Sequence, residues 1–307
     1  MNRTSPKGIL GFPVTPMKSN GEIDTEAFVK NIEFLVDGGL QAVFPACGAG
    51  EYTNLNDEEY KTLVDLTVKT VNGRVPVYSG VGGNIEEAKR RAKLSEELGA
   101  DGYLIMPPYL IIGSQEGIYE YFAQIAKASN LNAIIYQRDN AILEADTLRR
   151  LIEVEQIVGF KDGYGNMELN SEFSHKFKDK VDFLNGMPMA EVTMSTYMPL
   201  GYDSYSSAIS NYIPHISRKY FDAIQEGDDD VAENIYENVI LPLHAIRKKE
   251  KGYAVALIKA GMNIVGLPVE ATVRAPVIEV KDEHYNEMKE ILDKALELYP
   301  SDLYKNL

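Results

Sequence analysis

The sequence predicts a (β/α)8 barrel followed by a C-terminal helical extension. Eight short apolar runs alternate with amphipathic stretches, and the eight strand–helix units occupy about 220 residues, which is the spacing of such a barrel. The main alternative, an open doubly wound sheet, usually has fewer strands and a glycine-rich dinucleotide turn after its first strand. Here residues 12–16, after the first run, read Phe-Pro-Val-Thr-Pro, so the barrel is favoured.

The expected strands are mostly continuous apolar runs, as is typical of parallel strands covered on both faces. They are residues 8–14, 42–46, 75–80, 102–106, 133–136, 158–161, 183–185 and 204–208. The stretches between them carry apolar residues on one helical face, as Phe28, Ile32 and Leu35 do in the first of them. The expected helices include 25–37, 57–71, 85–98, 116–129 and 146–154.

The eighth unit ends near Gly227, and three further helical stretches follow it at 229–248, 253–265 and 282–298. Each has one polar face, so we expect these helices to pack on the barrel or on a neighbouring subunit. The chain therefore divides into a barrel, residues 1–227, and C-terminal helices, residues 228–307.

The net charge of −15 argues against nucleic acid and anionic membrane surfaces as partners. An anionic substrate would need a local positive site against that field. The single cysteine, Cys47, allows no internal disulfide, which fits a reducing compartment. The N-terminus is polar and every apolar run is shorter than a membrane span, so we expect no signal peptide, no membrane insertion and a cytoplasmic location.

The active site of a barrel lies at the C-terminal ends of its strands. Lys161 ends the sixth expected strand, where burial of an unpaired ammonium would lower its pKa and free the amine as a nucleophile. The alternative is that Lys161 lies in water or pairs with Asp162, and position alone favours neither interpretation. As the next residue in a strand, however, Asp162 points to the opposite face.

Tyr136 ends the neighbouring strand, so it can share one layer of the barrel mouth with Lys161. A phenol beside an imine-forming lysine can transfer protons, although a buried tyrosine more often only fills a core. Arg138 follows, and its planar fork suits a carboxylate. Its alternative role is a structural pair with Asp139 or another surface acid.

Residues 48–51 (Gly-Ala-Gly-Glu) follow the second strand, and glycines let backbone N–H groups approach an anion, although such a turn is a weak signal. We interpret Cys47 as a small core residue, because no histidine is near it in the sequence. Ser206, near the end of the eighth strand, could orient substrate or water, or could bond only to local backbone.

Four scattered histidines, His175, His215, His244 and His284, show no metal-ligand spacing. The sequence also has no Walker loop and no Gly-x-Ser-x-Gly elbow. We therefore expect no bound metal ion, and an imine at Lys161 would need no organic cofactor.

These motifs together resemble the dihydrodipicolinate synthase / N-acetylneuraminate lyase superfamily. The resemblance is carried by residues 48–51, 114–117 (Ser-Gln-Glu-Gly), 136 and 159–162 (Gly-Phe-Lys-Asp), and runs from about Gly8 into the C-terminal helices. It implies a (β/α)8 barrel, a homo-oligomer (tetramer or dimer) and a lysine imine with a keto acid. It assigns the imine to Lys161, the proton relay to Tyr136 and carboxylate binding to Gly48 and Ala49.

Within that superfamily the chain looks most like the 5-dehydro-4-deoxyglucarate dehydratases. The residues that carry this are 44–48, 136–140, 160–163, 190–192 and 205–208. The resemblance implies a decarboxylating hydro-lyase that converts 5-dehydro-4-deoxy-D-glucarate to 2,5-dioxopentanoate, water and carbon dioxide without a cofactor. It also implies that Arg138, Asn140, Gly186 and Ser206 bind this small keto sugar acid.

Two residues depart from the dehydratase pattern: Ala49 replaces a usual threonine, which leaves only backbone donors at that carboxylate site, and Gln137 replaces an asparagine. Leu110 stands where the synthase branch has a second tyrosine, so a synthase-type tyrosine relay is incomplete. A pyruvate-dependent aldolase or synthase is the alternative within the superfamily. An alternative of another class is a non-catalytic barrel that binds sugar acids, which the retained Lys161 and Tyr136 disfavour.

Overall fold

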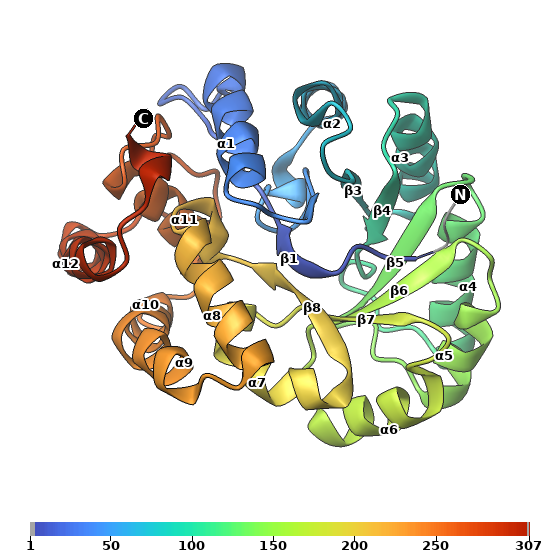
Figure 1. Cartoon of the computed structure of the whole chain (residues 1–307). Helices are drawn as coiled ribbons and strands as arrows, with labels where there is room; N and C mark the ends of the chain where they lie inside the picture. Colours follow the sequence, from blue (N-terminus) through green and yellow to red (C-terminus); the bar gives the residue numbers. More distant parts are fainter. Residues whose placement is uncertain (1–3, 306) are drawn as a thin grey trace.

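The computed structural model describes residues 4–305 and 307, and its centre is a ring of eight parallel strands surrounded by helices (Figure 1). The strands are β1 (Gly8–Gly11), β2 (Ala42–Val43), β3 (Tyr78–Val81), β4 (Gly102–Ile105), β5 (Asn132–Gln137), β6 (Ile157–Asp162), β7 (Asp182–Asn185) and β8 (Tyr202–Ser207). Their order is β2-β1-β8-β7-β6-β5-β4-β3, and a parallel bridge from Val43 to Val77 joins the two ends. The predicted (β/α)8 barrel is confirmed.

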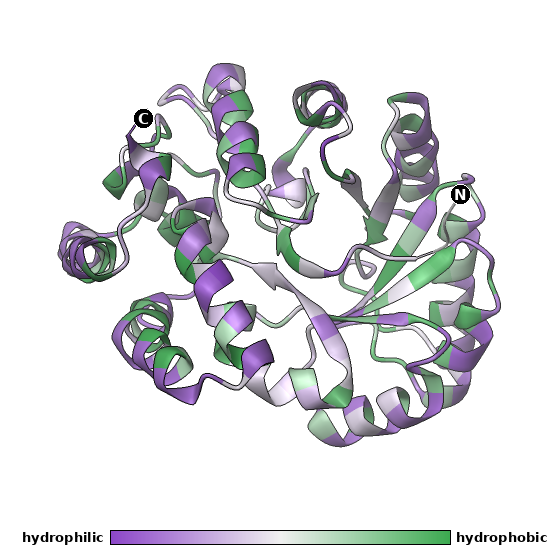
Figure 2. Cartoon of the chain, in the orientation of Figure 1, coloured by the Kyte–Doolittle hydropathy of each residue, from purple (hydrophilic) through white to green (hydrophobic). Residues whose placement is uncertain are grey.

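The helices that follow the strands cover the outside of the barrel (Figure 1). They are α1 (Thr25–Asp37), α2 (Asp57–Val71), α3 (Ile85–Glu97), α4 (Gln115–Ala126), α5 (Ala145–Ile152), α6 (Met167–Phe177), α7 (Met194–Tyr197) and α8 (Pro214–Glu226). Side-chain caps set several starts: Asp24 accepts from the Ala27 N–H, and Asn56 forms a reciprocal capping box with Glu59. In Figure 2 these helices alternate hydrophilic and hydrophobic residues along their turns, as expected when one face packs on the sheet.

Several strands are shorter than predicted. β1 ends at Gly11 instead of residue 14, and β2 keeps only Ala42 and Val43. Pro45 has no N–H for the ladder, and Ala46 has a left-handed φ of 52°, so the chain leaves the sheet early after β2. These early exits lengthen the loops at the C-terminal mouth of the barrel.

The extension contains α9 (Asp229–Ile235), α10 (Leu241–Arg247), α11 (Tyr253–Ile264) and α12 (Asp282–Leu298). The helical stretch expected at 229–248 is found from 229 to 247, but it is not a regular α-helix throughout, because the π-helix η5 (Tyr236–Ile240) lies between α9 and α10. Pro242 explains this local π-turn: it cannot donate to the carbonyl of Asn238, and its ring would press on that carbonyl in a regular α-helix. A wider π-turn before the proline relieves that crowding.

The extension shares one apolar core with the barrel. Barrel residues such as Val14 and Ile213 belong to the same buried cluster as Leu243 of α10 and Leu292 of α12. In Figure 1 this group of helices lies beside α1 and α8. Within the described part of the chain, no helix has the length and apolar character needed to cross a lipid bilayer.

Candidate active site

Lys161 lies near the C-terminal end of β6 with its amine held among aromatic rings. Its Nζ is 4.1 Å from the centre of the Phe12 ring and 4.5 Å from the centre of the Tyr136 ring, and the residue is only 4% exposed. No carboxylate among the described residues pairs with it. Burial lowers the pKa of Lys161 to about 7; Cys47 opposes the shift and the charge of Arg138 adds to it. A large fraction of the amine is therefore neutral near pH 7.

Asp162 faces the other side of the sheet and does not pair with Lys161. Its carboxylate accepts hydrogen bonds from the side chains of Gln137 at 3.0 Å, Asn170 at 2.7 Å and Tyr197 at 2.6 Å. Two backbone N–H groups of the following turn also donate to it. Because successive strand residues point to opposite faces, the buried acid is kept away from the amine. Gln137 binds Asp162 and therefore has a structural role, away from the cavity at the mouth of the barrel.

Tyr136 is the direct register partner of Lys161 on β5. Its hydroxyl donates to the Gly186 carbonyl at 3.0 Å and accepts from Nη1 of Arg138 at 3.2 Å. Burial raises the pKa of Tyr136, while Arg138 opposes that rise. The phenol therefore stays protonated at neutral pH and is a proton donor beside the amine.

Two glycines leave room for these side chains. A Cβ on Gly186 would lie 2.5 Å from Cε of Lys161, and a Cβ on Gly163 would lie 2.6 Å from the Tyr136 hydroxyl oxygen. Neither glycine has a positive φ, so space rather than backbone conformation requires them. The amine and the phenol occupy volumes that any larger residue at these positions would fill.

A cavity of about 280 Å³ opens at this end of the barrel. Seven of the predicted site residues line it: Gly48, Ala49, Tyr136, Arg138, Lys161, Gly186 and Ser206. Asn140 is not among the lining residues, and its amide donates to the Pro108 carbonyl at 3.3 Å. A substrate-binding role for Asn140 stays a prediction, and the observed contact supports the loop after β4 instead.

The cavity provides the positive site that an anionic substrate would need. Its lining holds three basic side chains, Lys161, Arg138 and Arg247, and no aspartate or glutamate from the described residues. The sequence did not single out Arg247, which stands in a basic run of the extension. Its spacing from Leu243 is the available signal, because residues four apart share a helical face.

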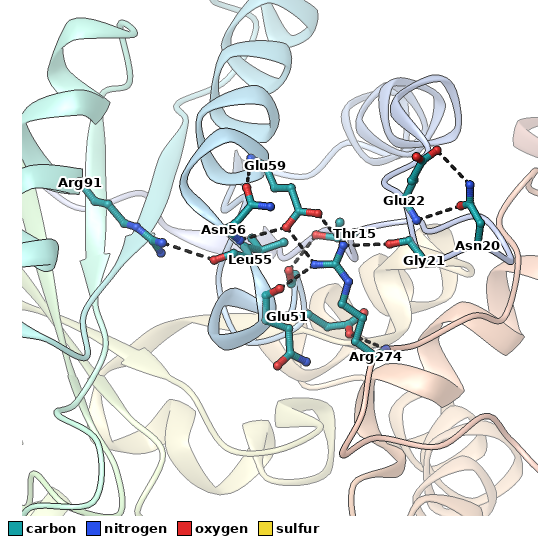
Figure 3. A network of polar contacts seen from close by, with 12 residues as sticks. Thr15, Asn20, Gly21, Glu22, Glu51, Leu55, Asn56, Glu59, Arg91 and Arg274 are labelled. Carbon is teal, nitrogen blue, oxygen red and sulfur yellow. Dashed lines mark hydrogen bonds and ion pairs between the residues drawn. The ribbon is translucent and has the colours of Figure 1, made fainter.

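The loop after β2, which carries Gly48 and Ala49, is fixed by the extension (Figure 3). Glu51 forms a buried ion pair with Lys259 of α11 at 2.7 Å. The backbone N–H of Arg274 donates to the same carboxylate at 3.3 Å, and its guanidinium donates to Glu59 at the start of α2. The segment around Arg274 thereby joins this loop to the C-terminal helices.

Cys47 is buried at the base of the same loop. Burial raises the pKa of its thiol to about 12, so the thiolate is scarce at neutral pH. Among the described residues, no group of three or more His, Cys, Asp or Glu side chains could hold a metal ion.

The barrel is closed, and its basic cavity and polar side chains lie at the carboxyl ends of the strands. This is the arrangement found in barrel enzymes. The model of the dihydrodipicolinate synthetase family matches residues 5–295. The chain belongs to this family, which confirms the resemblance found in its motifs.

Relatives of similar length carry a more specific name. A protein of Oceanobacillus iheyensis called "probable 5-dehydro-4-deoxyglucarate dehydratase" is 59% identical over 308 residues, with 100% of both chains covered. A Bacillus subtilis protein of the same name is 53% identical, with 97% of each chain covered. Among solved structures, dihydrodipicolinate synthase from Oceanobacillus iheyensis has a TM-score of 0.88 at 27% identity and covers 95% of this chain and 97% of its own.

Proposed function

We propose that the protein converts 5-dehydro-4-deoxy-D-glucarate to 2,5-dioxopentanoate, water and carbon dioxide through an imine at Lys161. One observation carries the proposal: a buried amine with a pKa of about 7 lies beside the Tyr136 phenol in a cavity with basic lining. The names of the relatives support the substrate. Membership of an enzyme family supports catalysis over mere binding.

The reaction begins at the C5 ketone of the substrate. The neutral Lys161 amine attacks this carbon, and loss of water from the carbinolamine gives an iminium that withdraws electrons from C4. The Tyr136 phenol, held protonated by burial, donates the proton that the departing oxygen needs. Hydrolysis at the end reverses this step and frees the lysine.

Elimination and decarboxylation follow from the iminium. A base removes a C4 proton, and the resulting enamine expels the C3 hydroxyl, which leaves as water. The new C3=C4 bond is conjugated with the iminium, so loss of carbon dioxide from C1 sends its electron pair from C2 through this system towards nitrogen. Protonation at C4 and conversion of the C2 enol to an aldehyde complete the five-carbon product. The base for C4 could be Tyr136, Ser206 or a water molecule.

Binding roles follow from the positions around the cavity. We propose that backbone donors at Gly48 and Ala49 bind the carboxylate next to the ketone, because this loop lies at the cavity and Ala49 has no hydroxyl. Arg138 and Ser206 are proposed to bind the distal hydroxyls and carboxylate. Gly186 lines the same cavity, and its carbonyl fixes the Tyr136 hydroxyl.

The deciding experiment incubates the protein with 5-dehydro-4-deoxyglucarate and measures carbon dioxide and product mass. We expect carbon dioxide and 2,5-dioxopentanoate, and borohydride should trap the ligand's mass on Lys161. Lys161→Ala should abolish turnover and borohydride trapping without loss of fold, since no described residue pairs with that amine. Pyruvate as the product would instead identify an aldolase, and an active alanine variant would refute the imine.

We also propose that the protein is a homo-oligomer. The loop between β4 and α4 exposes three consecutive apolar side chains: Leu110 at 97%, Ile111 at 71% and Ile112 at 79%. Such a run on a monomer leaves apolar surface in water, and it is typical of an interaction site. Light scattering on the purified protein would test the proposal.

A further inference from the structure

The end of the cavity that faces the extension carries a cation with no counter-ion. Arg247, the last residue of α10, lines the cavity together with Leu243 and Ile246. It is partly buried, and no carboxylate among the described residues pairs with its guanidinium. A partly buried charge without a partner is costly, so its retention at this wall calls for an anionic ligand.

Two other basic side chains near Arg247 already have partners. Lys249, two residues later, forms an ion pair with Glu287 on α12. In the cavity, Arg138 places Nε 3.2 Å from the Asp139 carboxylate and donates Nη1 to the Tyr136 hydroxyl. Arg247 therefore keeps all its donors for a ligand, whereas Arg138 has part of its fork occupied.

The two guanidinium groups also act on each other. Burial lowers the pKa of Arg247, and the positive charge of Arg138 lowers it further. Like charges that interact across a partly apolar cavity destabilise the empty site. An anion between or beside them removes this repulsion, and the apolar wall strengthens the resulting ion pair.

We propose that Arg247 joins Arg138 in binding the second carboxylate of the substrate, contributes most of the attraction because its donors are free, and thereby selects keto acids that carry a carboxylate at both ends. The inference rests on the proposed imine, which fixes the ketone end of the substrate at Lys161 on β6. A carboxylate at the far end can accept two hydrogen bonds from the planar guanidinium. A monocarboxylic keto acid of equal length has a methyl group in place of that carboxylate, so it would leave Arg247 without an ion-pair partner.

The test compares two six-carbon keto acids, 2-oxoadipate and 2-oxohexanoate, which differ only in a terminal carboxylate or methyl group. Calorimetric titration of the full-length protein gives both dissociation constants. We expect the unmodified protein to prefer the diacid by at least about tenfold. Arg247→Met should abolish most of this preference and leave the 2-oxohexanoate constant unchanged. Lys248→Met, a charge change at the adjacent exposed position, should keep the full preference.

Two results would overturn the inference: equal affinity of the unmodified protein for both acids, or an Arg247→Met variant that weakens both acids to the same degree. Borohydride trapping on the same samples tests the imine of the proposed function independently of Arg247. An absence of any adduct at Lys161 would refute the imine. The ratio of the two dissociation constants tests whether Arg247 binds the second carboxylate.

Discussion

Tyr136 and Lys161 face each other as register partners on adjacent parallel strands, with the lysine Nζ 4.5 Å from the centre of the tyrosine ring. This relationship sets both groups in one layer at the mouth of the barrel. Burial raises the pKa of the phenol, which stays protonated, and lowers the pKa of the amine, so that part of the amine population is neutral. One environment therefore provides an acid and a nucleophile at the same pH.

The pH profile should report the amine. With a pKa of about 7, roughly half of Lys161 is neutral near pH 7, against roughly one part in 3,000 for an unshifted lysine. Since only the neutral amine attacks, kcat/KM should fall about tenfold for each pH unit below that midpoint. Initial rates of carbon dioxide release across a pH series would measure the midpoint.

Arg138 provides the matched test of the same shift. Its positive charge lowers the pKa of Lys161, so Arg138→Met should raise that pKa and move the acidic limb to higher pH. Arg138→Lys keeps the charge and should leave the limb near its original position. A limb centred close to the ordinary lysine value in the unmodified protein would contradict the prediction.

Gly186→Ala should disable the lysine by displacement. The added methyl would lie 2.5 Å from Cε of Lys161, so the amine must move away from its place between the rings. A shift of about 1 Å can cost on the order of a hundredfold in rate, and we expect at least that loss in kcat. Gly113→Ala is the control, because its nearest neighbour atom would be 3.6 Å away. Equal activity of the two variants would show that the lysine tolerates the change.

Lys259→Met should destabilise the protein strongly. Lys259 and Glu51 are 0% and 2% exposed, so the variant leaves a buried carboxylate without its main counter-ion. We expect a loss of about 3–5 kcal/mol in the free energy of unfolding, measured by chemical denaturation. Lys289→Met breaks an exposed pair with Asp293 and should cost at most about 1 kcal/mol.

A second substitution separates charge from packing in that pair. Glu51→Leu added to Lys259→Met removes the stranded charge and should recover part of the lost stability. No recovery in the double variant would show that the lysine acts through its packing alone.

Charged residues in the exposed apolar loop should dissociate the proposed oligomer. The double substitution Ile111→Glu and Ile112→Glu places two charges where we expect apolar contact, so light scattering should report a smaller species. Leu298→Glu, at an exposed apolar position of α12, is the control and should not change the mass. A monomeric unmodified protein would remove the basis of this prediction.

Local signals made most of the fold predictable. The starts of α1 and α2 follow from Asp24 and Asn56, whose side chains cap backbone groups within three residues. Lys161 and Tyr136 were predictable as neighbours because the ends of adjacent parallel strands meet at one end of a barrel. The π-turn within the 229–248 helical stretch also has a local cause in Pro242, but the proline alone does not tell whether the helix ends there or continues through a wider turn.

Tertiary packing decided what could not be predicted. Arg247 stands in a basic run that looks like a solvated helix end, and only the docking of α10 on the barrel turns it towards the cavity. Asn140 follows the strand that carries Tyr136, yet its amide turns to the Pro108 carbonyl of another loop. Both outcomes depend on contacts with segments that are distant in the sequence.

The wall that α10 and α11 contribute to the cavity has a practical consequence for redesign. Lys161 and Tyr136 belong to β6 and β5, whereas Leu243, Arg247 and Ile258 belong to the extension. A mutant library confined to those three positions would vary the shape and charge of one wall and leave the covalent chemistry untouched. The variants could be screened for binding of other keto acids with a single measurement, the mass that borohydride trapping adds to Lys161.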